Sequence, residues 1–249
     1  MFFLLITLIL LLAFIFSMLG LGGAMVYNPL MVWFGYDFKE VVVSTGLLLN
    51  GLTALSAAWV YYRNKMIDFS IGLPLTVAAS LGAPVGAYFT RFVPTTTLLW
   101  IFAIVVIFAA VRMMLTSGQV EPESVRGTAM QRAALGTAVG LGVGALAGML
   151  GIGGGFLFVP LLIFLGYPTK TAAATTALAV VFSSFTGLAG HLAVGHFDWP
   201  LMLAASVAVV IGSQAGARVM TARMKSRQLK QMFGIVLLFV AAKLIMGLL

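Results

Sequence analysis

Eight apolar runs, most of them about twenty residues long, follow one another along this chain of 249 residues. A helix needs about 20 apolar residues to cross the hydrocarbon core of a bilayer. Only 8% of the residues are charged, against about 25% in an ordinary soluble domain, so water could not solvate the surface that these runs would present. The pattern predicts an all-α, polytopic helical membrane protein, with runs at about 1–34, 40–62, 70–90, 96–115, 131–166, 171–193, 200–220 and 229–248.

The remaining composition excludes several classes of function. The chain has no cysteine, which rules out disulfides, thiolate metal sites and cysteine nucleophiles. Its net charge of +8 comes from Lys and Arg in the short gaps between runs. That distribution is typical of loops facing an anionic cytoplasmic leaflet, and not of a surface that binds nucleic acid. No basic segment precedes the apolar N-terminus, so we expect the first helix not to be cleaved as a signal peptide.

The two halves of the chain resemble each other. The segment MLGLGG at 18–23 recurs as MLGIGG at 149–154, and the match continues through a proline, a Gly-Tyr pair, a lysine and a threonine at an offset of 131. Further along, GAPVGA at 82–87 recurs as GSQAGA at 212–217. Apolar bias alone would not place glycine, proline and lysine in one order. We therefore predict two repeats, at 1–115 and 129–249, joined by a polar linker at 116–128.

The orientation of the repeats follows from their Lys and Arg residues. If every run crosses once, the basic residues divide 6 to 8 between the two sides, which orients nothing. If the long runs at 1–34 and 131–166 instead enter and return as glycine-broken hairpins, three crossings follow in each half and the division becomes 11 to 3. The positive-inside rule favours the second arrangement. It predicts two inverted repeats in a cell inner membrane, with both termini outside and the linker in the cytoplasm.

Glycines break both long runs, as Gly20-Leu-Gly-Gly23 and as Gly151-Ile-Gly-Gly-Gly155. Glycine lets the backbone leave helical geometry, and irregular backbone persists in a membrane only where protein buries it or it lines a wet cavity. A short helix after each break would point its N-terminal amides and dipole at the break, an arrangement that binds anions. Alternatively, the glycines only allow close helix crossing. The first interpretation makes the following glycines substrate-binding: Gly20, Gly22, Gly23, Gly151, Gly153, Gly154 and Gly155.

Hydroxyl and amide side chains follow each break. They can donate to an oxyanion without burying a full charge, although hydroxyls in membrane helices commonly bond the carbonyls of their own helix. We expect the matched pair Thr45 and Thr176 to bind substrate, together with Ser44, Asn50 and Thr175. By contrast, the spacings Gly82-x3-Gly86 and Gly212-x3-Gly216 are typical of close helix packing.

Two residues are candidates for a proton or anion relay. His191 lies near the end of the sixth run, and histidine titrates at about pH 6.5. Arg218 is the cation nearest the interior of a run. For both residues a purely interfacial role is the alternative. All six acidic residues lie in loops or at run edges, so an anion is a better substrate than a cation. No catalytic residue, metal ligand or cofactor is expected.

The half-repeats MLGLGGAMVYNPLMVWFGYDFKEVVVST and MLGIGGGFLFVPLLIFLGYPTKTAAATT, with GAPVGA and GSQAGA, resemble the TauE/SafE sulfite exporter family over nearly the whole chain. The resemblance implies a permease, usually an exporter, for sulfite or organosulfonates. We expect transport of a small anion by alternating access. The alternatives are an anion channel, a membrane scaffold without flux, and an intramembrane enzyme using His191 with Ser183 or Ser184, which helical spacing disfavours. The sequence leaves the oligomeric state open.

Overall fold

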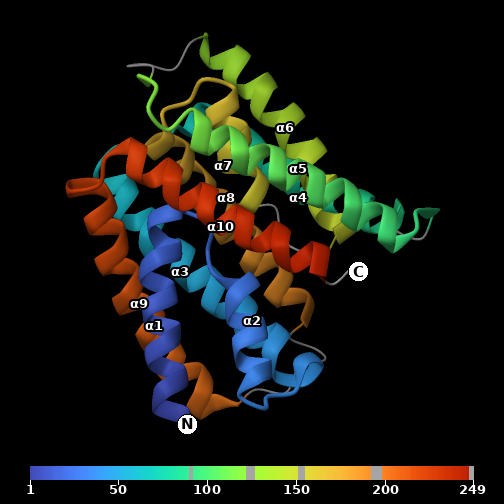
Figure 1. Ribbon diagram of the computed structural model, residues 1–249, viewed down its shortest axis with the longest axis vertical. Helices are drawn as coiled ribbons and strands as arrows, with labels where there is room; N and C mark the ends of the chain where they lie inside the picture. Colours follow the sequence, from blue (N-terminus) through green and yellow to red (C-terminus); the bar gives the residue numbers. More distant parts are fainter. Residues whose placement is uncertain (90–91, 122–126, 151–154, 192–197, 247–249) are drawn as a thin grey trace. The chain divides into compact units, whose positions relative to one another are not determined.

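The computed structural model describes residues 1–89, 92–121, 127–150, 155–191 and 198–246. Along these residues the chain folds into helices, and no strand occurs within them (Figure 1). The elements are α1 (Phe2–Leu19), α2 (Ala24–Trp33), the π-helix η1 (Phe38–Val42), α3 (Val43–Arg63), α4 (Phe69–Phe89), α5 (Thr95–Leu115), α6 (Ala129–Leu150), α7 (Gly155–Phe164), α8 (Thr169–His191), α9 (Trp199–Ala222) and α10 (Ser226–Met246).

Within the described part of the chain, 5 helices are long and apolar enough to cross a membrane: Phe2–Leu19, Glu40–Arg63, Phe69–Gly86, Thr169–Ala189 and Trp199–Ala222. Large apolar side chains are also exposed, among them Phe3 at 85%, Leu81 at 63% and Ile104 at 62%. A water-soluble fold would bury such side chains, whereas a surface facing lipid leaves them exposed. The prediction of an all-α polytopic membrane protein is confirmed.

The helices group into two compact units, and each unit takes helices from both halves of the sequence. Unit 1 comprises Met1–Ile67 and Ala173–Arg223, and unit 2 comprises Asp68–Ala172 and Met224–Leu249. Unit 1 therefore holds α1, α2, α3, α9 and most of α8, whereas unit 2 holds α4 to α7 and α10. The compact units cut across the predicted repeats at 1–115 and 129–249, and the boundaries of those repeats stay a prediction.

In unit 1, helix α9 packs closely against α1. Gly212 and Gly216 face the carbonyl oxygens of Leu10 and Phe14, and a Cβ on either glycine would overlap those oxygens. Because the later glycine of α9 faces the later carbonyl of α1, the two helices run in the same direction. Fully buried apolar side chains fill the space between α1, α2, α3 and α9, including Ile9, Tyr27, Met31, Leu49 and Leu201.

In unit 2, helix α4 packs against α6 through the same kind of contact. Gly82 and Gly86 face the carbonyl oxygens of Leu141 and Ala145. The carbonyls that receive the glycines in the two units are 131 positions apart, since 141 − 10 and 145 − 14 both equal 131. The same close helix contact is thus built twice, and the spacings Gly82-x3-Gly86 and Gly212-x3-Gly216 serve helix packing as expected.

The two short helices α2 and α7 also end alike. Each has 10 residues with a proline at the sixth position, Pro29 or Pro160. After each, the chain passes through a glycine with positive φ, 91° at Gly35 and 87° at Gly166. The next amide then bonds back to the helix, from Tyr36 to the Met31 carbonyl (3.2 Å) and from Tyr167 to the Leu162 carbonyl (3.0 Å). A glycine at this position, followed by a 6→1 bond of this kind, is the usual way for a helix to stop.

Glu121, in the segment after α5, connects three parts of unit 2. Its carboxylate accepts hydrogen bonds from the backbone N–H of Thr169 (3.2 Å) and from the Thr169 hydroxyl, at the first residue of α8. It also pairs with the Lys230 ammonium on α10 (3.2 Å). A carboxylate at a helix N-terminus is favoured by the helix dipole, so Glu121 fixes the start of α8.

Candidate functional site

The first glycine break lies between α1 and α2 in unit 1. Gly20 (φ 66°) and Gly22 (φ 73°) both have the left-handed backbone that favours glycine, and together they reverse the chain. Helix α2 then runs back against α3, because Gly23 bonds to Asn50 whereas Asn28, further along α2, lies against the earlier residue Gly46. In Figure 1 the chain turns at this point and α2 runs back beside α1. The break is buried, as Leu21 is only 3% exposed.

The amides that begin α2 are capped by a side chain from another helix. The Oδ1 atom of Asn50, on α3, accepts hydrogen bonds from the backbone N–H groups of Gly23 (2.5 Å) and Ala24 (2.9 Å). In most helices the N-cap residue itself supplies such an acceptor, but Gly23 has no side chain. Asn50 takes over that role from 27 residues away in the sequence.

The same carboxamide continues to a third helix. Asn50 Nδ2 donates to the Ser184 hydroxyl on α8 (2.7 Å), which in turn donates to the Val180 carbonyl (2.7 Å). Gly22 allows this arrangement, because a Cβ at position 22 would overlap the Asn50 carboxamide. One neutral side chain therefore holds together the break, α3 and α8.

The break lies within the length of α3 and not at either end. Helix α3 has 21 residues, which corresponds to about 30 Å at 1.5 Å per residue. Asn50 lies about 10 Å from its start and about 20 Å from Arg63 on the same scale. The N-terminal amides of α2, with the positive end of the α2 dipole, are thus directed at a point inside a helix of membrane-spanning length.

Several polar atoms near the starts of α3 and α8 are buried without a partner. They are Ser44 Oγ, Thr45 Oγ1 and Thr176 Oγ1, together with Asn28 Oδ1. Elsewhere hydroxyls bond to the carbonyl four residues back, as Thr53 does to Leu49 (2.7 Å) and Thr76 to Gly72 (2.7 Å). Ser44, Thr45 and Thr176 differ from these hydroxyls, and their role in substrate binding stays a prediction. A buried unpaired polar group costs about 1–3 kcal/mol, so these atoms are suited to a partner from outside the chain.

A family model described as Sulfite exporter TauE/SafE matches residues 5–244. The chain belongs to the TauE/SafE family. The "Probable membrane transporter protein YunE" of Bacillus subtilis is 29% identical over 92% of this chain and 92% of its own length. A "Probable membrane transporter protein" of Xylella fastidiosa is 29% identical over 93% of this chain and 90% of its own length. No solved structure matches the chain. The family consists of membrane transporters and not of enzymes, as the sequence predicted.

In this TauE/SafE protein the predicted site residues form one cluster and several outlying groups. Gly22 and Gly23 meet Asn50, and Gly20 lies against the backbone of Ala173 on α8. Thr45 and Thr176 are not brought together. Helices α3 and α8 are antiparallel, since Leu47 lies near Gly187 and Gly51 near Phe185. Thr45 is therefore about 7 Å along α3 from Asn50, and Thr176 is about 12 Å along α8 from Ser184 in the opposite direction.

The second break is described only in part. Gly151, Gly153 and Gly154 lie outside the described residues, as does the side chain of His191, whereas Gly155 is buried at the first position of α7. Ser44 and Thr175 are fully buried, like Thr45 and Thr176. Ser184 was absent from the predicted binding set, although it bonds Asn50. The available signal was Asn50 itself, because a carboxamide inside an apolar run needs partners on neighbouring helices.

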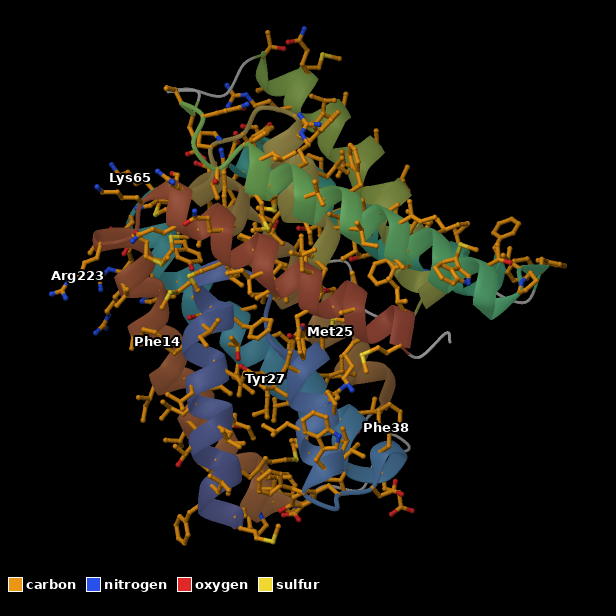
Figure 2. All side chains as sticks on the ribbon, in the orientation of Figure 1. Phe14, Met25, Tyr27, Phe38, Lys65 and Arg223 are labelled. Carbon is orange, nitrogen blue, oxygen red and sulfur yellow. The ribbon has the colours of Figure 1, made fainter. Side chains whose placement is uncertain are left out.

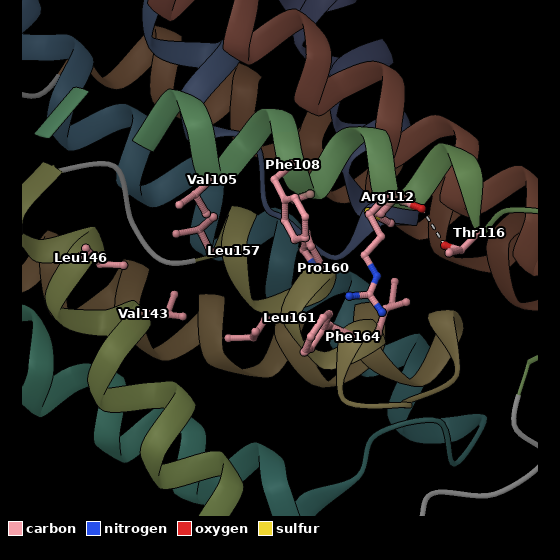
Figure 3. A pocket seen from close by; sticks show the side chains of 13 residues that line it. Val105, Phe108, Arg112, Thr116, Val143, Leu146, Leu157, Pro160, Leu161 and Phe164 are labelled. Atoms are coloured by element: carbon pink, nitrogen blue, oxygen red, sulfur yellow. Dashed lines mark hydrogen bonds between the residues drawn. The ribbon is translucent and has the colours of Figure 1, made fainter. Parts of the chain in front are cut away.

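Two of the cavities lined by described residues hold an arginine, and both lie away from the break. An apolar cavity of about 200 Å³ in unit 2 lies between α5, α6 and α7 (Figure 3). Its main polar side chain is Arg112, whose guanidinium carbon is 3.9 Å from the centre of the Phe164 ring. A polar cavity of about 340 Å³ in unit 1 is lined by both Arg63 and Arg218. Neither cavity includes Asn50 or the described glycines of the break.

Proposed function

We propose that this TauE/SafE protein moves a small sulfur oxyanion, such as sulfite or an organosulfonate, across the cell inner membrane by alternating access, and that the anion binds at the break capped by Asn50. The observation that carries the proposal is the cap. The first backbone amides of α2 lie against the interior of α3, a helix of membrane-spanning length. They donate to the neutral carboxamide of Asn50 on that helix. A neutral acceptor is a weaker partner for these amides than an oxyanion would be.

Binding would proceed by exchange of the cap. An oxyanion would accept from the Gly23 and Ala24 amides in place of Asn50 Oδ1, at the positive end of the α2 dipole. Rotation of the Asn50 carboxamide would then turn its NH₂ group towards the anion, and the Ser184 hydroxyl would become a second ligand by turning its proton from the Val180 carbonyl to the anion. The unpartnered hydroxyls of Thr45 and Thr176 lie on either side of this point along α3 and α8. They would donate hydrogen bonds to the anion as it enters or leaves the site. Every donor in this path is uncharged, so the anion would not be held too tightly to leave.

Charge in unit 1 supports the proposed orientation. Lys65 and Arg223 lie at the same end of unit 1 in Figure 2, with Arg63 and Arg218 close to them in the sequence. The acidic residues Asp37, Glu40 and Asp198 precede α3 and α9 at the opposite end. There, burial and then the Asp198 carboxylate raise the pKa of Tyr36. The positive-inside rule puts the basic end in the cytoplasm, and α1 then begins outside the cell.

Asn50→Asp tests this proposal with a near-isosteric change. A carboxylate at position 50 caps the same amides but repels an anion, so saturable efflux of sulfite from proteoliposomes should fall at least about a hundredfold while the protein stays folded. Gln131→Glu is the matched control, because Gln131 Oε1 also accepts from a backbone amide near the start of a helix (Thr128, 2.9 Å) and lines neither cavity. Acceleration of efflux by external substrate identifies a carrier, whereas its absence identifies a channel. Wild-type efflux in Asn50→Asp would refute the site.

A further inference from the structure

The polar cavity of unit 1 combines two arginines with neutral walls. Trp59, Val60, Arg63, Asn64, Gln214 and Arg218 line its volume of about 340 Å³ at the C-terminal end of α3 and on α9. Within the described part of the chain no acidic side chain lines the cavity, and neither arginine forms a salt bridge. Lys65 and Arg223 add positive charge at the same end (Figure 2). The cavity therefore presents guanidinium donors without a counter-charge.

The carboxamides of this cavity are fixed by the backbone. Gln214 Nε2 donates to the Ser56 carbonyl (3.2 Å), and Asn64 Nδ2 donates to the Val60 carbonyl (2.7 Å). The first bond ties α9 to α3, and the second holds Asn64 against the C-terminal end of α3. The two guanidinium groups are left as the groups that can bind a ligand, with five N–H donors each.

Two guanidinium groups that share a cavity repel each other, and a bound anion would remove that repulsion. Arginine matches the paired oxygens of a sulfonate, sulfate or phosphate with two parallel hydrogen bonds. The indole of Trp59 offers an apolar wall to the carbon part of an organic anion. The volume accommodates an anion of a few heavy atoms together with hydration water.

We propose that Arg63 and Arg218 form a second oxyanion-binding site, specific for tetrahedral oxyanions of the sulfonate, sulfate or phosphate type. The site is separate from the glycine break, because Arg63 lies 13 residues after Asn50 on the same helix, about 20 Å along its axis. Its occupancy requires no transport. Its role as the site that collects substrate from the cytoplasm rests on the proposed function. The oxyanion is either free in solution or part of a lipid headgroup.

Trp59 provides a direct probe of this site. In a variant with Trp33, Trp100 and Trp199 replaced by Phe, Trp59 is the remaining tryptophan of the 4 in the chain. We would reconstitute this protein in phosphatidylcholine nanodiscs and titrate it with sodium sulfate, at an ionic strength held constant with sodium chloride. A saturable change in Trp59 fluorescence is expected. Arg63→Gln and Arg218→Gln should each weaken sulfate binding about tenfold, as expected for loss of a charge-assisted hydrogen-bonding group.

Arg223→Gln is the matched control, since it removes the same charge from α9 outside the cavity lining, and it should leave the affinity within about twofold. Arg218→Lys keeps the charge but loses the paired hydrogen bonds, so it should give an intermediate affinity. A lack of saturable response in phosphatidylcholine would overturn the proposal. So would an equal loss of affinity in Arg223→Gln and Arg218→Gln, because the effect would then be bulk charge alone.

Phosphatidylglycerol separates the two sources of the oxyanion. If nanodiscs that contain this lipid lose the sulfate response of Trp59, the lipid competes with sulfate and the site holds a headgroup phosphate. An unchanged response identifies a free anion as the ligand. Asn50→Asp should lose efflux and keep the Trp59 response, so failure of the transport proposal leaves this one standing. Efflux that persists in a protein without a Trp59 response would overturn this inference alone.

Discussion

Replacement of Asn50 by leucine removes the cap of α2 without a large change in side-chain volume. The Gly23 and Ala24 amides, which now donate to Asn50 Oδ1 at 2.5 and 2.9 Å, would have no acceptor inside a buried break. Each unsatisfied donor costs about 1–3 kcal/mol, so the two together cost about 2–6 kcal/mol. Ser184 keeps its bond to the Val180 carbonyl, and the added apolar area offsets a small part. We expect Asn50→Leu to lower the free energy of unfolding by about 3 kcal/mol.

The measurement is reversible unfolding in mixed micelles, followed by circular dichroism. Asn50→Asp should keep most of the stability, because its carboxylate accepts from the same two amides and is favoured by the dipole of α2. Asn64→Leu, which removes one bond to its own helix at an exposed position, should change the free energy of unfolding by less than about 0.5 kcal/mol. If Asn50→Leu unfolds within that same range of the wild type, the two amides are satisfied without Asn50 and the cap has no energetic importance.

Three further changes test the packing and the electrostatics of the fold. Gly144→Leu places a Cβ 2.6 Å from the Ala79 backbone, whereas a Cβ at Gly142 on the same helix would meet nothing within 4 Å. We expect Gly144→Leu, and not Gly142→Leu, to lower the free energy of unfolding by about 1–3 kcal/mol in the same unfolding assay. Gly35→Ala, at φ 91° in open space, should cost about 1 kcal/mol from backbone strain, whereas Gly118→Ala, also in open space, should not destabilise the protein; equal effects would contradict the strain argument. Burial raises the pKa of Glu121, but hydrogen bonds from Thr169 and Ser226 and the Lys230 ammonium lower it below its ordinary value of 4.5. Because the folded-state pKa is depressed, this stability is present above about pH 4.5 and is lost as the pH falls through the folded value; an acid unfolding profile should therefore lose this component in Glu121→Gln, and an unchanged profile would show that the ion pair is not coupled to folding.

The sequence predicted the helices well because most apolar runs have the length of a crossing, and length does not depend on tertiary contacts. The break at Gly20 was predicted for a local reason too, since the positive φ of Gly20 and Gly22 favours glycine. The cap of α2 could not be predicted in this way. Gly23 has no side chain to mark an N-cap, and its acceptor comes from Asn50 on the next long helix.

The grouping of the helices into two compact units could not be predicted from the sequence either. Repeats at 1–115 and 129–249 describe where the pattern recurs, whereas the compact units pair α1 with α9 and α4 with α6. Glycine spacings show that a helix can be approached closely, but they do not say by which partner. The π-helix at Phe38–Val42 has no distinctive composition either.

Asparagine at position 50 affects both the stability of the break and the proposed binding of an anion. An aspartate there would cap α2 more strongly, because a negative charge interacts favourably with the N-terminal end of a helix dipole by about 0.3–1 kcal/mol. The chain instead uses a neutral carboxamide, which satisfies the Gly23 and Ala24 amides but leaves the positive potential of the helix end uncompensated. Under the proposed mechanism that potential is what an arriving oxyanion meets, and the carboxamide is what it displaces. A charged cap would make a poorer anion site, so Asn50→Asp should keep most of the free energy of unfolding while it abolishes efflux. A variant that kept both its stability and its efflux would show that the anion binds elsewhere.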